Sequence, residues 1–143
     1  MSTKAAIRDW LLNDAAIANK ISNRVFPGKV PQGESFPAIV LQKISRSHEY
    51  HLTGELGIGS EMIQVDVYDR GRNARWSVEY IAELIRLRMS GYRGQLNADV
   101  FCHGATIERN NEVNERPADA SDEWIERESM DFQVWTTTAV PTL

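Results

Sequence analysis

Hydrophobic and polar residues alternate along the segment 60–70. Ile63, Val65 and Val67 point to one side, while Gln64 and Asp66 point to the other. A period of two predicts a strand whose hydrophobic side covers a core. An extended segment at 38–47 precedes it, and the glycine-containing stretch 48–59 predicts a long loop between them. The sequence therefore predicts an antiparallel hairpin with one polar, partly acidic face.

The C-terminal third repeats this pattern in a predicted strand over 123–138. Its alternating residues are Met130, Phe132 and Val134, with Asp131 and Gln133 between them. Another strand is expected over 100–109, and the polar, acidic segment 110–122 predicts a mobile loop. Four polar residues are thus expected on one shared sheet face: Gln64, Asp66, Asp131 and Gln133.

Hydrophobic residues at helical spacing predict an N-terminal helix over 3–13, and Asp14 is placed to cap a short second helix. A longer helix is predicted over 73–90, where Asn73 is a suitable N-cap. This helix carries two hydrophobic stripes, although one stripe is enough to pack on a sheet. The second stripe consists of Trp76, Tyr80, Leu84 and Leu87.

The second stripe has two interpretations, which are compatible with each other. It is either buried under the N-terminal helix, with Ile7, Trp10 and Leu11 as partners, or it forms an interface with another protein. Tryptophan and tyrosine are enriched at such interfaces. A neighbouring subunit that covers part of the stripe would satisfy both interpretations.

The order helix, strands, helix, strands predicts an α+β fold. We expect a mostly antiparallel sheet of four or five strands, with the N-terminal helix and the long middle helix packed on one face. The chain is expected to form a single domain over 1–143, with a flexible tail at 139–143.

Composition narrows the function classes. The 143 residues are 42% hydrophobic and 25% charged, and the net charge is −4. The negative net charge argues against tight binding of this chain to the phosphate backbone of DNA, although DNA could still pass beside it. No hydrophobic run is long enough to cross a membrane, and the start of the sequence does not resemble a signal peptide. The one cysteine, Cys102, suits a reducing cytoplasm.

Candidate chemical sites have weaker support than structural alternatives. His48 and His51 are three residues apart, which on a strand places them on opposite faces and argues against a shared metal ion. Cys102 and His103 are adjacent and also face apart, so a buried structural cysteine is favoured over a thiol nucleophile. Neither a metal nor another cofactor is expected.

For two further clusters, a non-catalytic interpretation is also favoured. Asp66 and Asp131 resemble a carboxylate pair of the kind glycosidases use, but a hydrated or subunit-facing sheet surface is the better interpretation. The basic cluster Arg70, Arg72 and Arg75 is expected to be a solvated turn rather than a nucleic-acid site. The sequence therefore indicates no catalytic site.

The order of motifs resembles the tail completion family of long-tailed bacteriophages and prophages, whose members are tail terminator or head–tail joining proteins. The resemblance covers about residues 3–138 and begins with an N-terminal helix and a short second helix. The segments that carry it are RVFP at 24–27, VPQG at 30–33, PAIVLQ at 37–42, IQVDVY at 63–68 and SMDFQVW at 129–135.

The resemblance implies a structural virion protein and not an enzyme. It implies a homo-oligomeric ring, typically a hexamer, that caps the tail tube, ends its polymerisation and docks the head connector. Assembly is expected in the host cytoplasm, with the final location in the tail or neck of the virion. Trp76, Tyr80, Leu84 and Leu87 are expected at subunit interfaces. The polar sheet face is expected to line a lumen that DNA crosses without specific binding.

Two other classes remain open from the sequence. One is another neck component, such as a head-closure or connector protein, which would follow the same assembly logic. The other is a small α+β protein with a pocket, either a hydrolase that uses Asp66, Asp131 and a histidine, or a ligand-binding module.

Overall fold

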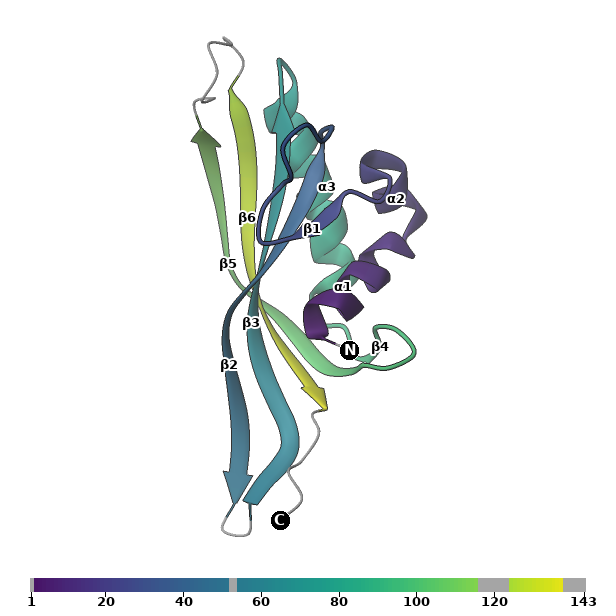
Figure 1. The fold of residues 1–143 in the computed structure, drawn as a ribbon, viewed down its shortest axis with the longest axis vertical. Helices are drawn as coiled ribbons and strands as arrows, with labels where there is room; N and C mark the ends of the chain where they lie inside the picture. Colours follow the sequence, from purple (N-terminus) through teal and green to yellow (C-terminus); the bar gives the residue numbers. More distant parts are fainter. Residues whose placement is uncertain (1, 52–53, 116–123, 138–143) are drawn as a thin grey trace.

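The structure, a computed structural model, describes residues 2–51, 54–115 and 124–137. It contains three helices and six strands within these ranges (Figure 1). The helices are α1 (Thr3–Leu12), α2 (Ala15–Ile21) and α3 (Ala74–Met89). The strands are β1 (Val25–Pro27), β2 (Ala38–His51), β3 (Gly54–Arg70), β4 (Gly94–Gln95), β5 (Phe101–Glu115) and β6 (Ile125–Thr137).

The strands form one sheet in the order β1-β2-β3-β6-β5-β4. Only β1 runs parallel to its neighbour, and every other pair is antiparallel. The strand pairs β2–β3 and β5–β6 extend toward opposite ends of the molecule (Figure 1). The two central strands, β3 and β6, pair continuously from Ile58 and Thr137 to Arg70 and Ile125.

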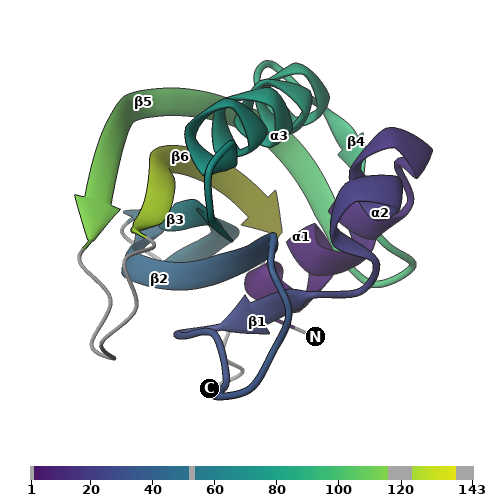
Figure 2. The same ribbon diagram turned by 90° about the horizontal axis from the view of Figure 1, so that it is seen from above.

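The sheet is strongly curled, and all three helices lie on one side of it (Figures 1 and 2). β-Bulges interrupt β2 between Lys43 and Ser45, and β5 between Ile107 and Arg109. An extra residue in one strand bends it and increases its twist, which accounts for part of this curl.

The core lies between the sheet and the helices. The alternating residues Ile63, Val65 and Val67 of β3 face it and are fully buried. β6 contributes Phe132 and its neighbours in phase, while α3 contributes Ile81 and the other members of its first stripe. The predicted periodicity of both strands and of this stripe is therefore confirmed.

The N-terminal helices begin where their capping residues predict. The side chain of Ser2 accepts a hydrogen bond from the backbone N–H of Ala5, and Asp14 accepts two from the start of α2. Trp10 stacks on Tyr92, with ring centroids 4.2 Å apart, and Arg88 lies over the Trp10 ring at 3.6 Å. These contacts fasten α1 to the C-terminal end of α3.

The α+β class is confirmed, but the expected sheet of four or five strands is wrong in detail. The sheet has six strands within the described residues, because the short segments β1 and β4 pair at its two edges. A segment of two or three residues carries too little periodicity to be recognised as a strand.

The predicted loop over 48–59 is also wrong for residues 48–51 and 54–59, which the structure describes. β2 continues to His51 and β3 begins at Gly54, with Gly57 at φ 80° where the register shifts. Glycine adopts this conformation without strain, so it permits a bulge inside a strand. Likewise, residues 110–115 belong to β5 and not to a loop, while 116–122 and the predicted tail 139–143 lie outside the described residues.

Candidate assembly surfaces

The sheet face opposite the helices brings the predicted polar residues together. Gln64 pairs across the strands with Asp131, and Gln133 lies opposite Met62 one step further along. The Gln64 amide donates hydrogen bonds to both carboxylate oxygens of Asp66, at 2.8 and 3.1 Å. Gln64, Asp131 and Gln133 are partly exposed and lie close together on this face, and we call these three residues the polar face.

Asp66 differs from its neighbours because it is only 2% exposed. Its carboxylate is buried and bound by Gln64, so it does not reach solvent in the single chain. A buried carboxylate that accepts two hydrogen bonds is satisfied, and here it fixes the Gln64 amide in one orientation. Asp66 therefore holds the Gln64 side chain in place without being part of the polar face itself.

At each of the two edges of the sheet, a long strand is largely uncovered. β1 covers β2 only as far as Leu41, and β4 covers β5 only at Phe101 and Cys102. Within the described residues, the remainder of β2 and the remainder of β5 have no strand on their outer sides. Free edges of this length are available for pairing with another chain.

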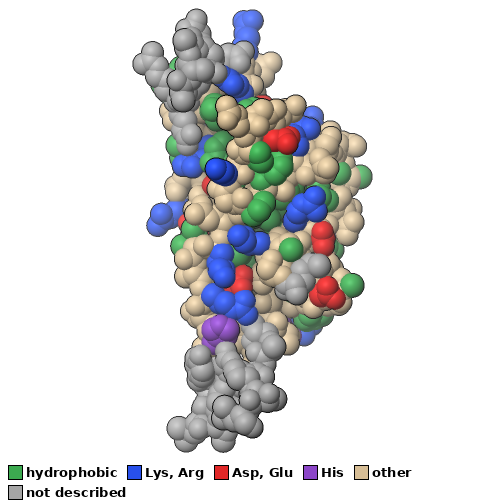
Figure 3. Space-filling model, in the orientation of Figure 1, with side chains coloured by type: hydrophobic (Ala, Val, Ile, Leu, Met, Phe, Trp, Pro, Cys, Tyr) green, Lys and Arg blue, Asp and Glu red, His purple; other side chains and the backbone are tan. Residues whose placement is uncertain are grey.

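The two edges differ in charge. Lys43 and Arg46 lie along β2, near His48, and Figure 3 shows Lys and Arg side chains gathered beside a histidine where the β2–β3 pair leaves the body. Arg46 binds Glu61 of β3, whose side chain is almost completely buried. The β5 edge instead carries the exposed residues Glu108, Arg109 and Glu112, with two negative charges and one positive charge.

The second stripe of α3 is mostly exposed. Trp76 is 73% exposed, Tyr80 53% and Leu87 67%, whereas Leu84 packs against the core. The predicted burial under Ile7, Trp10 and Leu11 is wrong for the three exposed residues. The reason is that α1 and α2 lie beside α3 and leave these three residues uncovered; Lys20 of α2 lies over the Tyr80 ring at 5.2 Å.

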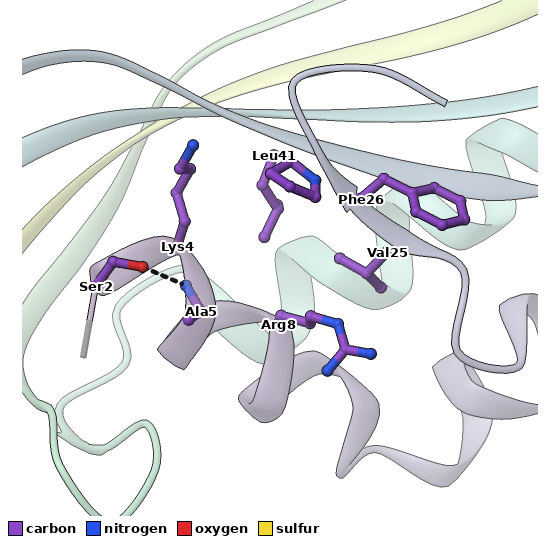
Figure 4. Close-up of a pocket in the computed structure, with 8 residues that line it drawn as sticks. Ser2, Lys4, Ala5, Arg8, Val25, Phe26 and Leu41 are labelled. Carbon is purple, nitrogen blue, oxygen red and sulfur yellow. Dashed lines mark hydrogen bonds between the residues drawn. The ribbon is translucent and has the colours of Figure 1, made fainter. Parts of the chain in front are cut away.

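An apolar groove lies between α1 and the edge strand β1 (Figure 4). Its volume is about 300 Å³. Lys4 and Arg8 stand on the α1 side, while Val25, Phe26 and Leu41 form the sheet side. The groove is therefore apolar with a basic rim.

Arg75 is surrounded by four carboxylates at the N-terminal end of α3. Its guanidinium lies 3.2 to 3.4 Å from glutamate oxygens of three elements. These glutamates are Glu79 of α3, Glu112 of β5, and Glu126 and Glu128 of β6. The cluster has a formal charge of about −3, one positive against four negative. The expectation of a solvated basic turn is therefore wrong for Arg75.

The carboxyl group of Glu128 is the most buried member of this acidic cluster. Burial raises the pKa of Glu128, the nearby Arg75 lowers it, and the charges of Glu79 and Glu112 raise it further. The sequence pattern held a signal for this arrangement, because Glu126 and Glu128 continue the core-facing phase of Met130 and so required a partner. Neither that partner nor the basic-rimmed groove was predicted.

The candidate chemical sites are not assembled. His48 pairs with Gly59, which is seven residues along β3 from Asp66, a span of about 23 Å at 3.3 Å per residue. The thiol of Cys102 is buried and donates to the Gly104 carbonyl at 3.2 Å, and burial raises the pKa of this thiol. The predicted structural cysteine is therefore confirmed. His103 instead lies 2.7 Å from the Thr137 hydroxyl.

Among the residues that the structure describes, no group of three or more His, Cys, Asp or Glu side chains is arranged to hold a metal ion. In the same part of the chain, no helix has the length and hydrophobicity to cross a bilayer.

Comparison with known proteins agrees with the sequence resemblance. The family model described as "Tail completion protein gp17" matches residues 5–137. The chain belongs to this family. The prediction of a phage-type tail completion protein is thus confirmed at the level of the family. No curated protein matches the chain.

A solved structure with a similar fold is described as "Virion of native gene transfer agent (GTA) particle". The likeness has a TM-score of 0.74 and covers 95% of each chain, at 16% identity. At this identity it concerns the fold alone.

Proposed function

We propose that this tail completion protein forms a closed ring at the end of the tail tube. The ring stops tail polymerisation and offers a docking surface to the head connector, without chemical catalysis. A hexamer is the ring that the family resemblance implies. Assembly takes place in the host cytoplasm, and the finished ring resides in the tail or neck of the virion.

The observation that carries the ring is the pair of open strand edges. They lie on opposite sides of one sheet, and β2 runs antiparallel to β5 because each successive pair from β2 to β5 is antiparallel. A neighbouring copy with the same orientation would therefore continue the antiparallel pattern from β5 of one copy to β2 of the next. Repeated contacts between two different surfaces form a ring when the rotation closes.

In the proposed ring, the polar face lines the lumen through which DNA passes. With the helices outside and the sheet inside, Gln64, Asp131 and Gln133 face the lumen. Amide groups and scattered carboxylates repel phosphates or bind them weakly, so DNA can slide past. Asp66 contributes by fixing the Gln64 amide.

Electron microscopy of the purified protein, alone and mixed with its tail-tube protein, tests the proposal. We expect rings with a central hole that bind to one end of each tube and prevent its further growth. A chain that remains monomeric in both preparations, while tubes grow at an unchanged rate, contradicts the proposal.

Another neck component remains the second candidate, because the open edges would serve a ring at either position. Binding partners separate the two: a terminator binds tubes in the absence of connector proteins, whereas a head-closure protein binds the connector and leaves tube growth unchanged. A hydrolase has less support, since Asp66 is buried and His48 lies far along the strand.

A further inference from the structure

Two surfaces of this chain are both apolar in part and carry opposite charges beside their apolar parts. The first, which we call the helix patch, consists of the exposed residues Trp76 and Tyr80 on α3 and the adjoining carboxylates around Arg75. The second is the basic-rimmed groove between α1 and β1 (Figure 4). One projects aromatic rings and the other is hollowed.

The helix patch combines exposed aromatic rings with surplus negative charge. Trp76 sits one residue after Arg75, whose single positive charge is set against four glutamates. Of these, Glu79 and Glu112 are exposed. Large aromatic side chains that enter a pocket provide much of the energy at protein interfaces. A matching surface therefore needs an apolar hollow and positive charges beside it.

The groove provides both. Val25, Phe26, Pro27 and Leu41 make its sheet side apolar, and Lys4 and Arg8 stand one helical turn apart at its rim. The guanidinium of Arg8 lies 3.8 Å from the carboxylate of Asp9. The volume of about 300 Å³ is at the lower end of the range for small-molecule pockets.

The placement of the two surfaces suits a contact between successive copies. α3 and β1 lie on opposite sides of the molecule (Figure 2), so one chain cannot join its own two surfaces. α3 packs over β3, β6 and β5, whereas β1 lies beside β2 at the other side of the sheet. Suppose that β5 of one copy lies beside β2 of the next copy. The helix patch of the first copy then faces the groove of the second copy.

We propose that the helix patch of one copy docks in the α1–β1 groove of the next copy, with Trp76 in the apolar hollow and the carboxylates beside Lys4 and Arg8. This contact rests on the proposed ring and defines its outer layer. It is heterologous, since each copy uses one surface of each kind. It also assigns an occupant to the exposed part of the second stripe.

Two complementary variants test the contact. The helix variant carries Trp76→Ser and Tyr80→Ser, and the groove variant carries Lys4→Glu and Arg8→Glu. All four side chains lie on the surface, so both variants are expected to fold, which circular dichroism and urea unfolding verify. Sedimentation velocity over a concentration series then measures self-association. We expect each variant alone to associate at least about tenfold more weakly than the unmodified chain.

The decisive measurement is the equimolar mixture of the two variants. The helix variant keeps an intact groove, and the groove variant keeps an intact helix patch, so the mixture is expected to form a one-to-one heterodimer and nothing larger. Matched controls are Trp124→Ser and Arg93→Glu, which change an exposed tryptophan and an exposed cation outside both surfaces. They are expected to associate like the unmodified chain.

Three results would overturn the inference: variants that assemble like the unmodified chain, a mixture that forms no heterodimer, and an unmodified chain that does not self-associate at millimolar concentration. Failure of the proposed function has a different signature. Rings that depend on both surfaces but do not bind or terminate tubes would confirm the contact and contradict the terminator role.

Discussion

At the scale of single residues, Arg75 connects the first turn of α3 to the β5–β6 strand pair. It is the shared counter-charge for Glu112, Glu126 and Glu128, which lie on the two strands. Removing it would leave carboxylates facing one another at a partly buried site. Breaking an ion pair from one side costs more than the pair contributes, because the remaining charge keeps its burial penalty.

We predict that Arg75→Met lowers the free energy of unfolding by about 2 kcal/mol at pH 7, a value reduced from that of a fully buried pair because Arg75 is partly exposed. Urea unfolding monitored by tryptophan fluorescence measures this loss. Adding Glu128→Gln to the variant is expected to recover part of it, since the substitution removes the most buried carboxylate.

The same cluster predicts the pH dependence of the loss. Burial and the neighbouring glutamates raise the pKa of Glu128 above its ordinary value. Its contribution to stability is therefore fully present below the ordinary carboxyl pKa and is lost as the pH rises through the raised one. Arg75 opposes this rise, so Arg75→Met should cost clearly less at pH 4 than at pH 7. An equal loss at both pH values would show that carboxylate repulsion is not the cause.

At the scale of elements, α3 carries a buried stripe on one side and a largely exposed stripe on the other. Ile85 is fully buried in the core, whereas Leu87, two residues later, is 67% exposed. Helical geometry places residues two apart on different faces, so the two side chains have different environments. This gives a matched pair of aliphatic residues within one helix.

Ile85→Ala is expected to lower the free energy of unfolding by about 3 kcal/mol, because it removes buried methylene groups and leaves a cavity. Leu87→Ala is expected to change it by about 0.5 kcal/mol or less, as for other surface substitutions. Chemical unfolding of the two monomeric variants under the same conditions provides the measurement. A large loss from Leu87→Ala would mean that the second stripe belongs to the core.

Elements with strong periodicity could be predicted from the sequence, including α3 and the core-facing phases of β3 and β6. Local chemistry also sufficed for the cap at Asp14, since a cap depends only on neighbouring residues. Asn73 stands at the N-cap position of α3 as predicted, but its side chain makes no capping hydrogen bond. The full lengths of the two strand pairs could not be predicted. The segment 48–59 contains glycines and few regularly spaced hydrophobic residues, and its described residues, 48–51 and 54–59, are held in β structure by pairing between β2 and β3.

The candidate surfaces follow the same division. The shared phase of Gln64 and Asp131 depends on alternation alone, so it was predictable, and the register confirms it. The burial of Asp66 and the meeting of Arg75 with the glutamates of β5 and β6 depend on tertiary packing. The groove was hidden for a similar reason, because its two walls come from α1 and a strand of only three residues.

At the scale of the whole molecule, the proposed ring assigns opposite tasks to the two sides of the sheet. The helix side carries the hydrophobic core and the apolar contacts, while the other side carries the polar face. If the polar face lines a lumen, its charge should control how strongly DNA is held there. Each subunit repeats the same face, so a small change per chain is multiplied around the ring.

Asp131→Lys combined with Gln133→Lys raises the charge of the polar face by about 3 per chain, two from the first substitution and one from the second. We expect rings of this variant to bind double-stranded DNA at low salt, with an affinity that falls steeply as salt increases, because binding through phosphates releases counterions. Rings of the unmodified chain should not bind under these conditions. Gel-shift titrations at several salt concentrations measure the difference, and particles assembled with the variant should release DNA more slowly.

A matched control separates lumen charge from total charge. Glu34→Lys combined with Gln32→Lys makes the same change in the exposed segment between β1 and β2, away from the polar face. If the polar face lines the path of DNA, the control should bind DNA more weakly than the variant and should not delay DNA release. Equal effects of the two variants would mean that DNA responds only to net charge, and the polar face would then lose its place in the lumen while the ring itself could stand.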